Sequence, residues 1–232
     1  FTAISLAFLA AAAYAELRLP PGTSWHAMIE SSAATRALSW AVLAATALSL
    51  LASQSYLRRE RILTGEYHAL LLWSATGALL LLRATELLAV FLALELLSIC
   101  LYALCAYHRR IAIGTEAAVK YFLMGAFVSS FVLFGIALIY GETGSTRLDQ
   151  IAESFTVAES VPILAALGAL LVIAGFGFKL SLVPFHAWSP DTYQGAPTPF
   201  GAFLSVAPKV ASAMVVVRIL LIVASTPAGL AR

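Results

Sequence analysis

Long apolar segments follow one another along the whole chain, and they constrain its fold more than any other feature. Several reach about 18 residues or more with few charged side chains, which is the length that a membrane-spanning helix needs. Of the 232 residues, 61% are hydrophobic and 11% are charged, whereas soluble domains carry about 25% charged residues. A transmembrane β-barrel would show shorter segments of alternating polarity. The sequence therefore predicts an all-α, multi-pass membrane protein.

The apolar segments predict about seven transmembrane helices, one of them discontinuous. They fall at residues 1–15, 37–57, 67–83, 87–107, 116–140, from 161 onward, and 198–223. Thr115 precedes the fifth span and has the hydroxyl that an N-cap needs. Because the sequence begins at Phe1 without a basic n-region, we expect a fragment of a longer protein rather than a cleaved signal peptide.

Arginines gather in loops that share one side of the membrane if the spans alternate. They are Arg58, Arg59, Arg61, Arg109 and Arg110. The polar stretch 141–160 falls on the other side and holds four carboxylates and one arginine. The positive-inside rule then places the arginine loops in the cytoplasm or its equivalent. The net charge is only +2, which indicates no nucleic-acid partner.

The segment 161–195 is too long for a single helix across a membrane. Its length would exceed about 50 Å as one helix, whereas the hydrocarbon core is about 30 Å thick. We expect two half-helices with a break at Ser181, Leu182 and Pro184; a plain helix followed by a long loop is the alternative. Broken helices within membranes line cavities, and they recur at ion sites.

The chain has three lysines, Lys120, Lys179 and Lys209, and all lie inside predicted spans, whereas the loops use arginine. A buried lysine can lose its proton and arginine effectively cannot, so this segregation indicates titratable cations within the membrane. Lys120 is near enough to its helix end to reach the interface, so that interpretation stays open. Lys209 lies too deep in its predicted span for its side chain to reach the membrane interface. His186 is either a relay group or an ordinary residue beside the break.

Glu95 lies in the middle of the apolar run AVFLALELLSICLYAL, with no basic residue within four positions. A charged side chain at the centre of a bilayer costs about 3 kcal/mol or more. A structural ion pair with a lysine is one explanation, but apolar residues in place of a buried ion pair would usually stabilise the fold equally or better. A proton path explains a carboxylate and lysines at this depth directly. We expect Glu95 and Lys179 to face the interior and approach each other, directly or through water.

No motif for a metal or a redox cofactor is present. Cys100 and Cys105 are five residues apart in one apolar run, which separates them by roughly 140° on a helix. They are therefore expected to be core residues. The sequence also lacks CxxC, HExxH, P-loop and GxGxxG patterns. We expect no metal and no cofactor in this chain itself.

Four segments carry a resemblance to a known family. They read FLALELLSICLYAL, EAAVKYFLMGAFVSSFVLFGIALIYG, GFGFKLSLVPFHAWSPDTYQGAPTPF and SVAPKVA. Together they resemble the antiporter-like membrane subunits of respiratory complex I, NADH-quinone oxidoreductase, and the N type most closely. The Tyr-Gln-Gly in WSPDTYQGAPTP distinguishes it from the L and M types and from Mrp cation/proton antiporters. The resemblance covers roughly residues 60–223.

This resemblance implies a proton-translocation unit built from inverted repeats of five helices. Glu95, Lys120, Lys179 and Lys209 match the family's charged residues on four successive helices, the third of which is discontinuous. The implied organisation is N-terminal helices at 1–57, one antiporter-like repeat at 58–223, and the start of a C-terminal half at 224–232. The second repeat lies outside this sequence.

The resemblance also implies what surrounds the chain. It would be a subunit of a proton-translocating NADH-quinone oxidoreductase in a bacterial inner membrane or an equivalent organelle membrane. Its partners would be the lipid bilayer, neighbouring antiporter-like subunits and small K-type subunits. NADH, FMN, iron–sulfur clusters and quinone would be bound by other parts of that complex. An Mrp-type cation/proton antiporter and a non-pumping structural subunit of the membrane arm are the alternatives.

Overall fold

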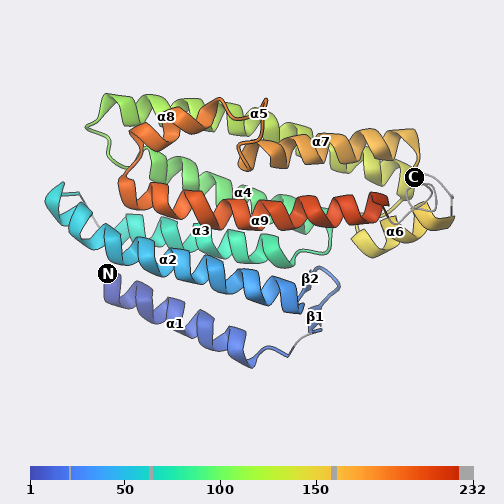
Figure 1. Cartoon of the computed structure of the whole chain (residues 1–232), viewed down its shortest axis with the longest axis horizontal. Coiled ribbons are helices and arrows are strands. Elements are labelled where there is room, and N and C mark those ends of the chain that lie inside the picture. Colours follow the sequence, from blue (N-terminus) through green and yellow to red (C-terminus); the bar gives the residue numbers. More distant parts are fainter. Residues whose placement is uncertain (21, 63–64, 158–160, 225–232) are drawn as a thin grey trace.

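The computed structural model describes residues 1–20, 22–62, 65–157 and 161–224, which are largely helical. The elements in chain order are α1 (Thr2–Arg18), β1 (Ser24–Trp25), β2 (Ile29–Glu30), α2 (Ala33–Arg59), α3 (Gly65–Arg83), α4 (Leu87–Cys105), α5 (Ala112–Thr143), α6 (Leu148–Val157), α7 (Ile163–Lys179), α8 (Trp188–Gly195) and α9 (Thr198–Ala224). The long helices run along the length of the molecule (Figure 1). α2 packs against α9, and α5 packs against α7.

Six of the seven predicted spans each correspond to one helix, whose ends lie within four residues of the prediction. The sixth, predicted as two half-helices over 161–195, corresponds to α7 and α8. Among the described residues, α2, α4, α5 and α9 are long and apolar enough to cross a membrane, and α7 is a shorter apolar helix. The helical fold is therefore confirmed. The number of crossings stays a prediction.

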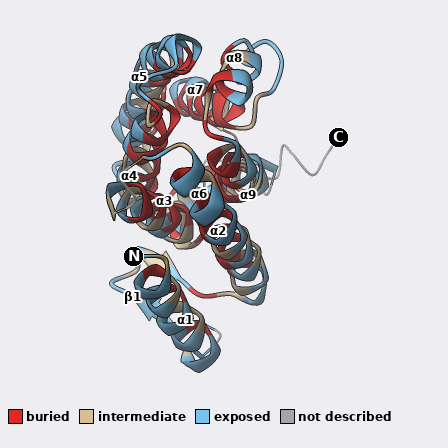
Figure 2. Cartoon of the chain, turned by 90° about the vertical axis from the view of Figure 1, so that its left-hand side faces the viewer, coloured by how far each residue is buried: buried red, intermediate tan, exposed pale blue. Residues whose placement is uncertain are grey.

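Large apolar side chains cover the outer faces of these helices. Leu92, Ile99, Phe127 and Leu170 are each more than 60% exposed. Buried residues lie on the faces that the helices turn toward one another (Figure 2). Apolar surface this extensive is rare on a soluble monomer, and lipid chains would cover it in a membrane.

The fifth helix begins earlier than predicted, so Thr115 is not its N-cap. α5 starts at Ala112, and Ile111 holds the cap position in an extended conformation. The Ile111 N–H donates to the His108 carbonyl over 3.1 Å, which closes the preceding turn. Because the residues between that turn and Thr115 are all able to form a helix, the helix extends back to the turn.

Two elements in the polar stretches were not predicted, and both lie at the same end of the molecule (Figure 1). The β1–β2 hairpin is antiparallel, and Ile29 forms a further bridge with Ala84 between α3 and α4. Glu86 forms a bridge with Arg147, just before α6. α6 is amphipathic and buries residues such as Ile151 against the bundle. Backbone pairing thus joins three loops at this end.

The two arginine loops lie at the opposite end, where α2 meets α3 and α4 meets α5 (Figure 1). The alternating arrangement therefore brings both basic loops to one end and the acidic segment with α6 to the other, as the sequence predicts. Which of these ends faces the cytoplasm stays a prediction from the positive-inside rule.

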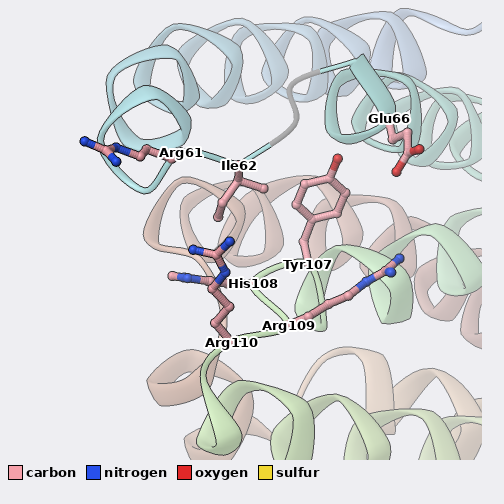
Figure 3. A pocket seen from close by; sticks show the side chains of 7 residues that line it. All are labelled: Arg61, Ile62, Glu66, Tyr107, His108, Arg109 and Arg110. Atoms are coloured by element: carbon pink, nitrogen blue, oxygen red, sulfur yellow. The ribbon is translucent and has the colours of Figure 1, made fainter.

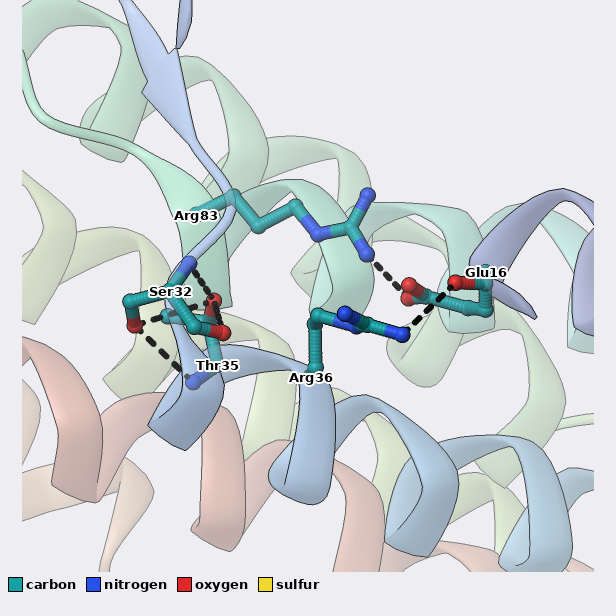
Figure 4. A network of polar contacts seen from close by, with 5 residues as sticks. All are labelled: Glu16, Ser32, Thr35, Arg36 and Arg83. Atoms are coloured by element: carbon teal, nitrogen blue, oxygen red, sulfur yellow. Dashed lines mark hydrogen bonds and ion pairs between the residues drawn. The ribbon is translucent and has the colours of Figure 1, made fainter. Parts of the chain in front are cut away.

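A buried ion pair fixes the end of α1 to the bundle. Glu16 on α1 is 4% exposed, and its carboxylate pairs with the guanidinium of Arg83 at the end of α3. Arg36 on α2 donates to the Glu16 carbonyl over 3.4 Å from a second direction (Figure 4). Nearby, Ser32 and Thr35 form a reciprocal capping box that starts α2.

Glycines allow α5 and α7 to approach each other closely. A Cβ on Gly135 would lie 2.5 Å from the Gly168 carbonyl oxygen, and a Cβ on Gly168 would lie 2.6 Å from the Gly135 carbonyl oxygen. Gly175, further along α7, faces Val132 in the same way. Small residues at helix contacts are the common means of close packing in membranes. This contact fixes how deep the end of α7 lies along α5.

Candidate functional site

The predicted break lies between α7 and α8. α7 ends at Lys179, and the chain is non-helical until α8 begins at Trp188. Ser181, Leu182 and Pro184 all lie in this connection. Ser181 has φ of 57°, which is the left-handed region that a residue with a side chain rarely adopts. Two helical segments with an interruption between them therefore replace the single continuous helix.

Trp188 fixes the second segment against the first. Its side chain is 2% exposed, and its indole N–H donates to the Phe178 carbonyl over 2.9 Å. Its ring stacks on Tyr121 of α5, with ring centres 4.4 Å apart and planes 12° apart. The Phe178 carbonyl also accepts from the Ser181 N–H over 3.0 Å, so it has both a turn partner and the indole, and α8 packs beside α5.

Lys179 is buried at the break, with 4% of its surface exposed. Its ammonium donates to the Tyr102 hydroxyl of α4 over 3.2 Å. It also lies over the rings of Tyr102, Tyr121 and Phe178, at 4.9, 5.2 and 5.4 Å from their centres. Aromatic faces attract a cation, most strongly where water is excluded. A single oxygen ligand nevertheless satisfies a buried ammonium poorly, because it has three N–H donors.

Lys179 ends its helix inside the bundle. It contacts Tyr121, which is nine residues after the first residue of α5. At about 1.5 Å per residue this is about 14 Å along α5. The side chain is therefore enclosed by α4 and α5 rather than placed at the end of the bundle.

A stripe of polar side chains on α4 leads away from Lys179. It contains Glu95, Ser98 and Tyr102, whose spacing of three and four residues places them on one face of the helix. Glu95 is partly buried and accepts a hydrogen bond from the Ser129 hydroxyl of α5 over 2.6 Å. The stripe therefore faces α5 along two turns of α4.

A glycine on α5 makes room for the end of this stripe. Gly125 faces the Tyr102 hydroxyl so closely that a Cβ on it would lie 2.0 Å from that oxygen. Gly125 is four residues before Ser129 and four after Tyr121, so the three share one face of α5. The polar stripe of α4 therefore packs against the face of α5 that contains Tyr121, Gly125 and Ser129.

Glu95 and Lys179 do not form a direct ion pair. The four ion pairs that the described residues form include neither of them. Tyr102 lies between the two, and Glu95 is two turns from Tyr102, or about 10 Å along the helix. The Ser98 hydroxyl on the same stripe donates to the Leu94 carbonyl over 2.5 Å, and Glu95 accepts from Ser129. The predicted approach of Glu95 to Lys179 is therefore not a direct contact.

The other predicted residues lie outside this buried group. Lys209 on α9 is partly buried, and its ammonium lies over the Tyr193 ring of α8 at 5.6 Å. Lys120 is exposed and pairs with Glu116 over 2.7 Å and with Asp191 of α8 over 2.8 Å. His186 is exposed in the connection before α8.

Residues 84–229 match the sequence pattern of a family described as NADH:quinone oxidoreductase/Mrp antiporter, transmembrane. The chain belongs to this antiporter family. The matched residues include all three lysines and Glu95, together with both segments of the broken helix.

Similar proteins in the antiporter family are longer than this chain. The NADH-quinone oxidoreductase subunit N of Paramagnetospirillum magneticum is 42% identical over 183 residues, which are 77% of this chain and 38% of that subunit. Across the curated relatives that it matches, the chain spans about two fifths of their length.

Two solved structures have the same fold. A chain of respiratory complex I from Thermus thermophilus is 33% identical with a TM-score of 0.73, and the match covers 99% of this chain and 49% of that one. A chain of the Mrp complex from Dietzia sp. has a TM-score of 0.81 at 24% identity, covering 97% of this chain and 26% of that one. The second likeness shows the fold alone.

Sequence reasoning missed the residues that surround Lys179 in this antiporter-family chain. It did not single out Tyr102, Ser129 or Gly125, although the periods 95–98–102 and 121–125–129 are visible in the sequence. It also missed Asp191, the partner of Lys120. A helical wheel drawn through Glu95 would have located the first stripe.

Metal ligands are not grouped in the part of the chain that the structure describes. No three side chains of histidine, cysteine, aspartate or glutamate come close enough there to hold a metal ion. Cys100 and Cys105 are both buried and not disulfide-bonded. The chemistry that this region can perform rests on the amine, the carboxylate and the hydroxyls.

Proposed function

We propose that this chain is part of an N-type membrane-arm subunit of NADH:quinone oxidoreductase and contributes a proton-translocation half-channel. The observation that carries the proposal is Lys179, a buried lysine held at a helix break inside the bundle. Its ammonium has one hydrogen-bond acceptor, Tyr102. A structural role would be served better by an apolar residue at this depth. Family membership of residues 84–229 supports the same conclusion.

Lys179 is the group that holds and releases the proton. As an ammonium it donates a hydrogen bond to Tyr102. As a neutral amine it would avoid the free-energy penalty of burying a charge. Because a hydroxyl can accept one hydrogen bond and donate another, Tyr102 can pass a proton between Lys179 and the rest of the stripe. We propose that water completes the path between Tyr102 and Glu95 when the protein is in its membrane.

Glu95 controls the charge of Lys179 from a distance. An ionised Glu95 favours the ammonium over the amine, because opposite charges attract each other more strongly inside a protein than in water. Movement or protonation of Glu95 removes that stabilisation and releases the proton.

Lys209 is the next acceptor, across the break on α9. It lies over Tyr193 of α8, so any movement of the short α8 segment changes its surroundings. Lys120 has a supporting role, because its pairs with Glu116 and Asp191 hold α8 to α5. His186 stays a second candidate for a relay group because it lies in the connection itself.

The complete channel requires more than this chain. The N-terminal helices (1–57) and one antiporter-like repeat (58–223) would provide seven crossings, and residues 224–232 would begin the second repeat; 225–232 lie outside the described residues. The partners would be neighbouring antiporter-like and small K-type subunits in a bacterial inner membrane or equivalent. NADH, FMN, iron–sulfur clusters and quinone would reside elsewhere in that complex.

The alternative with a specific observation in its favour is an Mrp-type cation/proton antiporter, because the description of the matched family names both kinds of protein. The deciding experiment is purification of the full-length protein that contains this chain from its native membrane. Co-purification with flavin and iron–sulfur proteins, together with NADH-driven proton uptake in vesicles, supports the proposal. Purification without redox proteins, with sodium/proton exchange in vesicles, would overturn it in favour of the antiporter. Assembly with redox proteins and unimpaired pumping after Glu95 and Lys179 are both neutralised would indicate a structural subunit.

A further inference from the structure

A basic pocket lies at the end of the bundle that carries the arginine loops. It has a volume of about 300 Å³ and is formed where the α2–α3 and α4–α5 connections meet. Arg61 and Ile62 come from the first connection, and Tyr107, Arg109 and Arg110 come from the second. The volume is at the lower end of the range of about 300–1,000 Å³ that is usual for ligand sites.

The charge of the pocket favours an anion. The lining contains three arginines, Arg61, Arg109 and Arg110, and one carboxylate, that of Glu66. Arg110 points toward Ile62, and Arg109 extends on the other side of Tyr107, so the two guanidinium groups flank the pocket (Figure 3). The four ion pairs of the described residues include none of the three arginines. Their donors are therefore available to a ligand.

The backbone at Arg61 ends α2 in a tight turn. Its φ is 54°, in the left-handed region. Ile62 donates to the Leu57 carbonyl over 3.0 Å and closes the end of α2, an arrangement in which glycine usually holds the position of Arg61. An arginine at this position is conformationally less favourable than glycine. Its side chain extends away from Arg109 and Arg110 (Figure 3), so the last two arginines are the ones that a ligand in the pocket would meet.

The position of the pocket indicates the kind of anion. It lies at the ends of α2, α4 and α5, three helices that are long and apolar enough to cross a membrane, and therefore at the level of lipid headgroups. The first turns of α5 carry exposed apolar side chains, including Val119, Phe122 and Leu123 at 50–60% exposure. A ligand with an anionic head and an apolar tail would match both surfaces.

We infer that this pocket binds the phosphate headgroup of an anionic phospholipid, with the acyl chains along the outer face of α5. Arginine suits the phosphate because its planar group donates two parallel hydrogen bonds to it. The inference is independent of proton translocation, since neither Glu95 nor Lys179 lines the pocket.

The test is native mass spectrometry of the full chain in detergent with phosphatidylglycerol or phosphatidylcholine carrying the same acyl chains. We compare the double variant Arg109→Gln/Arg110→Gln with the control Arg58→Gln/Arg59→Gln. The control removes the same charge from the same end of the bundle, at residues that do not line the pocket. Each arginine contributes about fivefold to binding, or about 1 kcal/mol. The pocket variant should therefore bind phosphatidylglycerol about 25-fold more weakly, and the control less than threefold.

Several outcomes would overturn the inference. Equal binding of the two lipids by the unmodified chain would exclude a headgroup site, and equal losses in the two double variants would indicate only general attraction to the basic end. Inorganic phosphate that displaces phosphatidylglycerol at equal concentration would indicate a site for free phosphate. The single variant Arg109→Gln repeats the test if the double variant does not fold, with about a fivefold loss expected.

Discussion

Replacing Gly125 with alanine perturbs the site without removing any charged or polar group. The new Cβ would lie 2.0 Å from the Tyr102 hydroxyl oxygen, which must move by about 1.4 Å to reach the ordinary contact distance of 3.4 Å. This displaces the hydroxyl from its 3.2 Å hydrogen bond with Lys179. A hydrogen bond to a charged group is worth about 1.5–3 kcal/mol. Its loss favours the neutral amine of Lys179 more than tenfold.

The matched control is Gly141→Ala, on the same helix. A Cβ on Gly141 meets nothing within 4 Å, and both variants gain about 0.8–1.0 kcal/mol of helix propensity. The assay is NADH-driven proton uptake in vesicles that contain the full-length protein in its assembled complex. We expect Gly125→Ala to assemble but to pump protons at less than a tenth of the rate of Gly141→Ala. Equal rates in the two variants would refute a role for the Tyr102–Lys179 bond in proton transfer.

Three further predictions concern stability and charge. Gly168→Ala should lower the free energy of unfolding by about 1–3 kcal/mol, measured by thermal unfolding in detergent, because its Cβ would lie 2.6 Å from a carbonyl oxygen of α5. Glu16→Gln should cost about 3–5 kcal/mol in the same assay, since it leaves Arg83 as a buried charge without its partner; an unchanged midpoint would mean that water serves Arg83 instead. The hydrogen bond from Arg147 lowers the pKa of Asp149, so this pair stabilises the fold above the ordinary carboxyl pKa of about 4 and ceases to do so as the pH falls through the lowered value. Arg147→Ala should return that pKa toward its ordinary value in an NMR titration, and an unchanged titration would assign the shift to another group.

The apolar pattern predicted the helices well because a membrane leaves few choices. Each span must be a helix of nearly fixed length, so an apolar run determines both the type of the element and its approximate ends. The break near Pro184 was predictable for the same reason, since 161–195 exceeds one crossing. α6 was missed because its burial comes from an amphipathic face within a polar stretch rather than from an apolar run.

The site was predicted only in part, because the sequence shows where charges lie but not which neighbour each one contacts. Lys179 was correctly placed in the interior. Its actual hydrogen-bond partner is Tyr102 rather than Glu95, because the packing of α4 against α5 sets the register. Lys120 was equally ambiguous from the sequence, since only the fold brings Asp191 beside it.

The most direct test of the account replaces Lys179 with arginine in the full-length protein, assembled in its complex. Arginine retains a cation that can donate to Tyr102 but cannot release a proton. The control is Lys120→Arg, where a fixed charge suffices for the pairs with Glu116 and Asp191. The measurement is proton uptake per NADH oxidised in sealed vesicles. We predict assembly of both variants, with pumping lost in Lys179→Arg and retained in Lys120→Arg; full pumping by Lys179→Arg would show that Lys179 supplies only a fixed charge.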